Sequence, residues 1–346
     1  MDFENKIIEA LKKKNLSDSS IKLYIRNIQK LNSDDKLKNL KFLEDVQTIT
    51  NHIDKYKPNT RRIYLISIIS ILNSLENQKL KKIADKYYEH MMKLINNIKN
   101  NKEDLKMTET QKENWLSFDE VSKKLDELIE KVNAFSRNKT LSEKQYNTLL
   151  SMMVLSLYVY NKPKRNQDYQ LMNIVYEYND NLNDDFNYLS YSTNKMIFNV
   201  YKTYKKHGQL IESYDEKLKN IIDKYIKFHP LLKNGKIKKD TNVYFLVYYN
   251  GQPLKQVNSI TRILNKIFDK NIGSSMLRHF YHSSKYGDTI KEMKKDAESM
   301  GHTMETVLEN YIKVDDTKEN NNKEEEEEEE EKPKKRKNKK NVVSFD

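Results

Sequence analysis

The spacing of apolar residues changes along the chain, and that change is the strongest constraint on its fold. Over roughly the first 160 residues, Ile, Leu and Tyr recur at the three- and four-residue spacing of amphipathic helices. After Arg165 the segments 171–178, 196–204 and 209–213 instead alternate β-branched or aromatic residues with polar ones. Helical spacing returns at Glu216 and continues to about residue 312, with one short apolar strand expected at 243–248. The pattern predicts helices first and a mixed unit second.

Lapses in this pattern mark the expected domain boundaries. Residues 99–112 are rich in Asn, Lys, Glu and Asp and lack apolar periodicity, which is typical of a linker. We therefore predict a multidomain chain: an all-α domain over 1–100, a linker over 101–113, and a mixed α+β domain with a small antiparallel sheet over 114–316. Residues 317–346 are of low complexity and are expected to be a disordered acidic and basic tail.

Composition excludes several classes of protein and site. The 346 residues contain no cysteine, which excludes disulfides, thiol nucleophiles and thiolate metal sites. No apolar run approaches the ~18 residues of a membrane span, and no signal peptide is visible, so we expect a soluble intracellular protein without a membrane partner. The histidines lack metal-ligand spacing, and only six glycines are present, so neither a metal nor a nucleotide cofactor is expected.

The positive charge is concentrated in the part expected to fold. The whole chain has a net charge of +12, and the last 30 residues hold nine Lys and Arg against ten Asp and Glu, which leaves +13 on residues 1–316. Such an excess favours a polyanionic partner, here double-stranded DNA, because cations that neutralise phosphates release condensed counterions. Charge alone leaves open the alternative that the composition reflects a proteome rich in Lys, Asn and Ile.

The tail combines two opposite charge runs. Residues 324–331 are eight consecutive Glu, and residues 333–340 read Pro-Lys-Lys-Arg-Lys-Asn-Lys-Lys, a cluster typical of nuclear-import signals. We expect a nuclear protein whose residues 333–340 bind an import receptor. The alternative is a second electrostatic tail that binds nucleic acid without a receptor.

Five polar motifs follow one another in a distinctive order. Arg165 precedes Asp168 by three residues at a predicted helix-to-strand turn, and Lys202 follows near a strand turn. Arg278 stands in a Leu-Arg-His segment, Gly301-His302 comes about two dozen residues later, and Tyr311 lies nine residues beyond His302. This order and spacing resemble the tyrosine recombinase (phage integrase) family. The resemblance covers about residues 114–316, and the first 100 residues match the family's core-binding domain in size and position only.

The resemblance implies a phosphoryl-transfer site. Arg165 and Arg278 would grip the non-bridging phosphate oxygens, which planar guanidiniums do better than lysines. Tyr311 would attack phosphorus and hold the strand covalently, so that no metal or nucleotide is needed. Lys202 would donate a proton to the leaving oxygen, with Lys205 on the same turn as the alternative.

The remaining expected site residues support this machinery. His302 would donate a hydrogen bond to the phosphate, and Asp168 would hold Arg165 in place. Three residues before Arg278, the family most often has His or Lys, whereas this chain has Ser275. Because a hydroxyl is a poor base, deprotonation of Tyr311 would fall to His302, His279 or water.

The expectation from sequence is therefore a site-specific DNA recombinase or integrase that forms a 3′-phosphotyrosyl intermediate as a homotetramer on paired sites. Together with the import signal, it suggests a mobile element or large DNA virus of a eukaryotic cell. Two alternatives stay open: a monomeric type IB topoisomerase, which shares the chemistry, and a DNA-binding protein without catalysis. Each residue also has an ordinary interpretation, with Tyr311 in a core, Arg278 in a salt bridge and Lys202 on a solvated surface.

Overall fold

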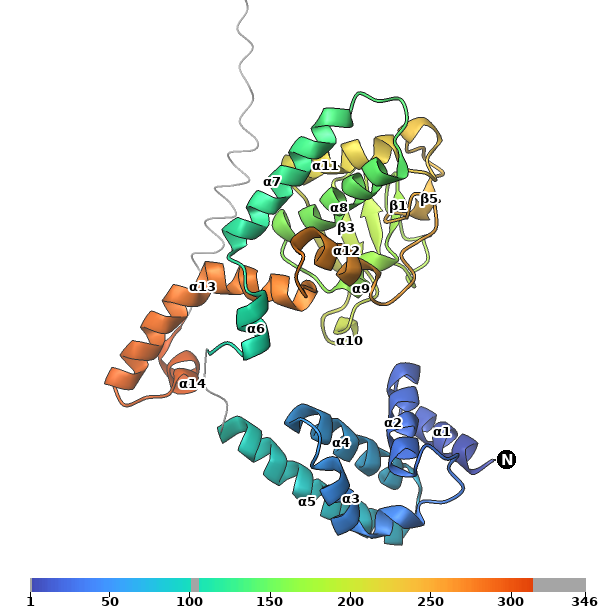
Figure 1. Cartoon of the computed structure of the whole chain (residues 1–346), viewed down its shortest axis with the longest axis vertical. Coiled ribbons are helices and arrows are strands. Elements are labelled where there is room, and N and C mark those ends of the chain that lie inside the picture. Colours follow the sequence, from blue (N-terminus) through green and yellow to red (C-terminus); the bar gives the residue numbers. More distant parts are fainter. Residues whose placement is uncertain (1, 101–105, 314–346) are drawn as a thin grey trace, which may run out of the picture. The chain divides into compact units, whose positions relative to one another are not determined.

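The computed structural model describes residues 2–100 and 106–313 and divides the chain into two compact units, Met1–Met107 and Thr108 onward (Figure 1). The predicted tail, with its acidic run and its import segment at 333–340, lies outside the described residues. Within them the chain is mostly helical, with one small sheet in the second unit.

The first unit consists of helices around a single apolar core. They are α1 (Phe3–Lys13), α2 (Asp18–Leu31), α3 (Val46–Ile53), α4 (Pro58–Ser74) and α5 (Gln78–Asn100), with a 3-10 turn η1 (Lys41–Glu44). Their starts follow local signals in the sequence: Ser17 accepts a hydrogen bond from the Ser20 amide, and Pro58 occupies the first turn of α4. The core includes Ile28, Ile68 and Tyr87, whose hydroxyl donates to the carbonyl of Leu43 over 2.9 Å.

The second unit packs helices and a sheet around a buried helix, α8 (Glu143–Val159). Its other helices are α6 (Glu109–Asn114), α7 (Phe118–Phe135), α9 (Asn166–Gln170), α10 (Tyr204–His207), α11 (Glu216–Lys227), α12 (Ser259–Phe268), α13 (Ser274–Ser299) and α14 (Met304–Thr306), with short turns η2 (Lys233–Gly235) and η3 (Val307–Tyr311). Figure 1 shows α7 and α11 beside α8 and the sheet on its other side. Because α8 is apolar on all faces from Met152 to Tyr158, it can form the centre of this core.

The sheet has five short strands in the order β4-β3-β2-β1-β5. The strands are β1 (Asn173–Val175), β2 (Tyr188–Ser190), β3 (Lys195–Phe198), β4 (Leu210–Ser213) and β5 (Asn242–Tyr244). The prediction of an antiparallel sheet is wrong at one pair, because β1 and β2 run parallel, with Asn173 opposite Tyr188. The alternating pattern did not reveal β2, whose three residues are all buried. A small apolar cluster around Tyr188 closes the long connection from β1 to β2.

Three other boundaries differ from the sequence pattern. The predicted linker contains α6, which begins with a reciprocal cap between Thr108 and Gln111. The predicted strand 196–204 ends at Phe198, so Lys202 lies in an irregular connection before α10. The helical spacing predicts helices over 276–286 and 290–298, but these residues belong to the single helix α13 despite Gly287.

Candidate active site

Arg165 stands at the start of α9, directly after the buried Pro163. Its backbone N–H donates to Oδ2 of Asp168 over 3.0 Å, and the Asp168 N–H donates back to the Arg165 carbonyl, also over 3.0 Å. This reciprocal pair fixes the turn that carries Arg165. Asp168 thus contacts Arg165 as the sequence suggested, although through the backbone rather than through the guanidinium.

The positive charge of Arg278, on α13, acts on the same carboxylate. Burial raises the pKa of Asp168 above its ordinary value of 3.8, while the hydrogen bond from Arg165 and the positive charges of Arg165, Lys164 and Arg278 oppose that rise. Both guanidiniums are half-buried, and within residues 2–100 and 106–313 neither forms an ion pair with a carboxylate. Arg278 uses its Nε to donate to the Ser274 carbonyl over 3.2 Å, which leaves its terminal nitrogens available.

Asn166 joins α9 to the starts of two other helices. Its amide N–H donates to Ser274 Oγ over 3.3 Å, and its side-chain nitrogen donates to Thr261 Oγ1 of α12 over 2.8 Å. The buried Tyr158 hydroxyl donates to its side-chain oxygen over 2.7 Å. Asn166 thereby fixes the N-terminus of α13 next to Arg165, and helix N-termini present free N–H groups to anions.

Two predicted residues near Arg278 are exposed on α13. Ser275 lies in the first turn of this helix, one residue after the serine that bonds Asn166. His279 places its Nε2 3.4 Å from the side-chain nitrogen of Gln111 in α6. Both side chains are therefore accessible, Ser275 beside the helix N-terminus and His279 beside α6.

Asn187 ties the connection that carries Lys202 to α9. Its side-chain nitrogen donates to the backbone carbonyls of Asp168 (2.8 Å) and Val200 (2.9 Å), and its oxygen accepts from the Val200 amide (2.7 Å). Lys202 and Lys205 are both exposed in this connection between β3 and β4. Figure 1 shows α9, α10 and the start of α13 at the same end of the unit. Lys202 follows the anchored Val200 by two residues, and Lys205 lies in α10.

Sequence analysis did not identify Asn187. Asparagine is common in this chain, and this one precedes a strand that the alternating pattern did not reveal. Its burial and its three side-chain hydrogen bonds become visible only when α9 and the β3–β4 connection meet. No local signal in the sequence could have separated it from the solvent-exposed asparagines nearby.

His302 and Tyr311 lie together, but at the opposite end of α13. Gly301, with φ of 74°, ends this helix, and the His302 amide donates to the Ala297 carbonyl over 2.8 Å. The His302 and Tyr311 rings are 5.1 Å apart between centroids and help to line a hollow of about 240 Å³ with Asp296 and Ala297. The Tyr311 side chain is 62% exposed, so its hydroxyl does not belong to the core.

The predicted residues therefore form two groups in this conformation. Twenty-one residues of continuous helix separate Arg278 from Ser299, which at 1.5 Å per residue is about 32 Å along the axis. Figure 1 shows α13 leaving the body of the unit and changing direction near its middle, with α14 folded back beside its second half. Arg165, Asp168, the Lys202 connection and Arg278 form an anion-attracting group, while the imidazole and the phenol form the second.

The described residues contain neither a metal-binding cluster nor a membrane-spanning helix. Among residues 2–100 and 106–313, no group of three or more His, Asp or Glu side chains could hold a metal ion. In the same ranges no helix combines the length and the apolar character required to cross a bilayer.

Comparisons with known proteins give little further guidance. No family model matches the chain. No solved structure matches it significantly. The chain is similar to the DVA-1 polyprotein of Dictyocaulus viviparus, with 23% identity over 263 residues, which cover 74% of this chain and 16% of that protein. This chain therefore spans about a sixth of that relative, whose name states no activity.

Proposed function

We propose that this protein is a DNA strand-transfer enzyme that cuts and rejoins duplex DNA through a 3′-phosphotyrosyl intermediate, as a site-specific recombinase of the tyrosine recombinase type. The observation that carries the proposal is the hydrogen bond from Asn166 to Ser274, which holds the N-terminus of α13, four residues before Arg278, beside the turn that carries Arg165. Two half-buried arginines that form no ion pair with a carboxylate of the described residues, next to helix N–H groups, favour an anionic ligand such as a phosphate of a nucleic acid backbone.

The chemistry assigns one step to each group. The Tyr311 oxygen forms a bond to phosphorus as the bond from phosphorus to the 5′ oxygen breaks, and Arg165 and Arg278 stabilise the charge on the non-bridging oxygens. The phenolic proton passes to His302, whose ring lies beside Tyr311, or through water. The departing 5′ oxygen takes its proton from Lys202. Rejoining reverses these steps. The phosphotyrosyl bond conserves the energy of the broken phosphodiester bond, so rejoining needs no other energy source.

The proposal requires that Tyr311 and the guanidiniums meet during the reaction. Every residue of α13 from His282 to Asp296 is exposed or half-buried, so little packing fixes the direction of this stretch. Gly287 stands in its middle, and no heavy atom lies within 4 Å of where its Cβ would be, so packing does not require a glycine. Either α13 bends further near Gly287 when DNA binds, or Tyr311 of one copy enters the arginine group of another.

Covalent trapping tests the proposal. The full chain is incubated with a pool of duplexes that carry a central 5′-bridging phosphorothiolate and randomised flanks, and adducts are counted on denaturing gels. We expect an adduct that Tyr311→Phe abolishes while DNA affinity changes less than about twofold. Tyr286→Phe, a second exposed tyrosine at the C-terminal half of the unit, is the matched control and should form the adduct normally.

Other outcomes would identify the rival functions. Tight binding without any adduct would overturn the proposal in favour of a DNA-binding protein without catalysis. Relaxation of supercoiled plasmid without recombinants from two-site plasmids would favour a type IB topoisomerase. Of these two alternatives, the separation of Tyr311 from the guanidiniums in this conformation favours the DNA-binding protein without catalysis.

Mixing inactive variants separates the two routes by which Tyr311 reaches the phosphate. Tyr311→Phe lacks the nucleophile, and Arg278→Ala lacks one guanidinium. Restored adduct formation in the mixture indicates that one copy supplies Tyr311 to another. If the mixture stays inactive while the native protein forms the adduct, Tyr311 reaches the phosphate within its own copy, through a bend of α13.

A further inference from the structure

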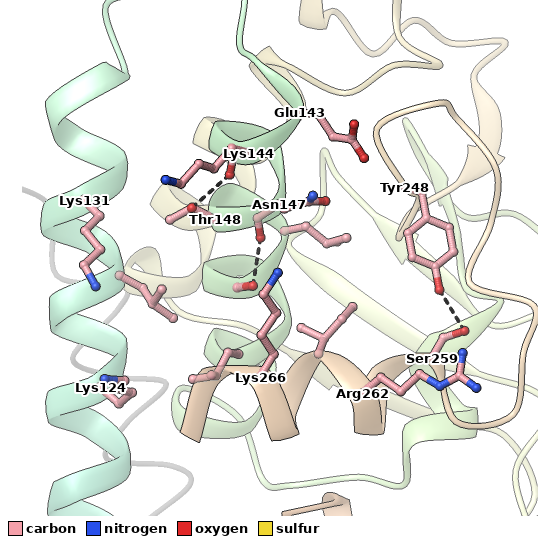
Figure 2. A pocket seen from close by; sticks show the side chains of 15 residues that line it. Lys124, Lys131, Glu143, Lys144, Asn147, Thr148, Tyr248, Ser259, Arg262 and Lys266 are labelled. Atoms are coloured by element: carbon pink, nitrogen blue, oxygen red, sulfur yellow. Dashed lines mark hydrogen bonds between the residues drawn. The ribbon is translucent and has the colours of Figure 1, made fainter. Parts of the chain in front are cut away.

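A second cationic surface of the mixed unit lies between α7, α8 and α12. There a groove of about 960 Å³ is open to solvent, and Figure 2 shows side chains of all three helices around it. Leu128, Leu150 and Ile267 form an apolar floor. Its cationic side chains are Lys124, Lys131, Lys144, Arg262 and Lys266, and Glu143 is its one acidic residue.

Several of these cations lack an acidic partner. Lys124 pairs with Glu127 over 2.8 Å, and Arg262 donates to the Gln256 side chain over 2.7 Å. Lys131, Lys144 and Lys266 are exposed and form no ion pair with any carboxylate of the described residues. Three like charges held around one concave surface repel one another, so an anionic ligand would be stabilised there.

We propose that the groove binds the chain's own acidic run, residues 324–331, and that this contact competes with external polyanions. The run offers eight carboxylates to a rim with five cations, and extended it spans about 26–29 Å. Lys313 is the last described residue. Glu324 follows it by eleven residues and can lie at most about 40 Å away, and Glu331 follows it by eighteen residues and can lie at most about 65 Å away.

The tether is long enough for this contact. Helix α13 has 26 residues and is about 39 Å long, and only the short segment 269–273 separates its start from α12, which forms one wall of the groove. A segment tethered at this range has an effective concentration of about a millimolar, so even a weak contact is populated.

The shape of the groove favours an extended peptide over a duplex. Its cations come from three helices around an apolar floor, where the aliphatic stems of glutamate side chains can pack beside lysine stems. The Asn147 side chain also lines the groove and can donate to a carboxylate. This inference does not depend on strand-transfer activity, because it concerns only the groove and the acidic run.

Carbodiimide cross-linking of the full chain tests the contact directly, because the reagent condenses a lysine amine with a nearby glutamate carboxylate. At high dilution, we expect Lys131, Lys144 and Lys266 to form at least fivefold more cross-links to residues 324–331 than three exposed control lysines of the same unit, Lys236, Lys238 and Lys239. Equal yields at the two sets would overturn the proposal.

A soluble octaglutamate peptide provides a second readout. In a full-length variant with all eight glutamates of the run changed to Gln, the peptide should bind about tenfold more tightly than in the native chain, because the tethered competitor is gone. Combining Lys131→Glu, Lys144→Glu and Lys266→Glu in that variant should abolish binding, whereas the same change at the three control lysines should not. Equal affinity in native and Gln chains, or protection of the groove lysines from acetylation by duplex DNA but not by octaglutamate, would refute it.

Discussion

Removal of the Asn187 side chain tests the part of the site that sequence analysis missed. The Asn187→Ala change deletes three hydrogen bonds of 2.7–2.9 Å that join Asp168 to Val200. Asn187 is only 5% exposed, so water cannot fully replace them. At a net contribution of about 1 kcal/mol per hydrogen bond, we expect the free energy of unfolding to fall by about 3 kcal/mol.

The assay uses the one tryptophan of the chain. Trp115 belongs to the second unit and packs against Phe280 with ring centroids 5.1 Å apart, so its fluorescence in a urea titration reports the unfolding of that unit. Asn133→Ala is the matched control. Asn133 is exposed and accepts a single hydrogen bond from Lys224, so its loss should cost less than about 0.5 kcal/mol. A loss below about 1 kcal/mol for Asn187→Ala would refute the assigned role.

Three further predictions concern buried titratable groups and α13. Burial lowers the pKa of His229 to about 4, so NMR should show a neutral ring from pH 8 to 5. The free energy of unfolding should fall as the pH drops from about 6.5 through 4, and a ring that titrates near 6.5 would contradict this. Because burial raises the pKa of Asp168, native protein should lose stability relative to Asp168→Asn as the pH rises from 3.8 through the raised value, measured by urea titration; a constant difference would contradict it. Gly287→Ala should raise stability by up to about 1 kcal/mol, because its Cβ meets no neighbouring atom, and should reduce adduct formation if α13 bends there; an unchanged adduct yield would exclude that bend.

Local signals allowed much of the helical framework to be predicted. Ser17 caps α2, Pro58 occupies the first turn of α4, and Ser142 caps α8 through a reciprocal bond with Gln145. The sheet was harder to predict, because its strands have three or four residues, too few for a clear alternation. Strand β2 pairs parallel to β1 across a long connection, and such pairing depends on tertiary contacts.

Only those contacts of the candidate site that join residues close in the sequence could be predicted. The spacing of Arg165 and Asp168 predicted a contact, which the structure contains as a backbone hydrogen bond. The effect of the Arg278 charge on Asp168 could not be read from local sequence, because it depends on the packing of α13 against α9 through Asn166. The distance between Arg278 and Tyr311 depends on how far α13 bends, and neither Gly287 nor Asp288 determines that angle locally.

Spin-label distances between the two groups of site residues test the central claim most directly. The chain has no cysteine, so the exposed positions Gln167 on α9 and Glu309 in η3 can be changed to Cys and labelled alone. Without DNA we expect a separation near the ~30 Å that α13 imposes. With the trapped duplex we expect a population below about 20 Å, either within doubly labelled copies or between singly labelled copies that are mixed. Distances that stay long in both experiments, while DNA is bound, would contradict the assignment of Tyr311 and the two arginines to one reaction.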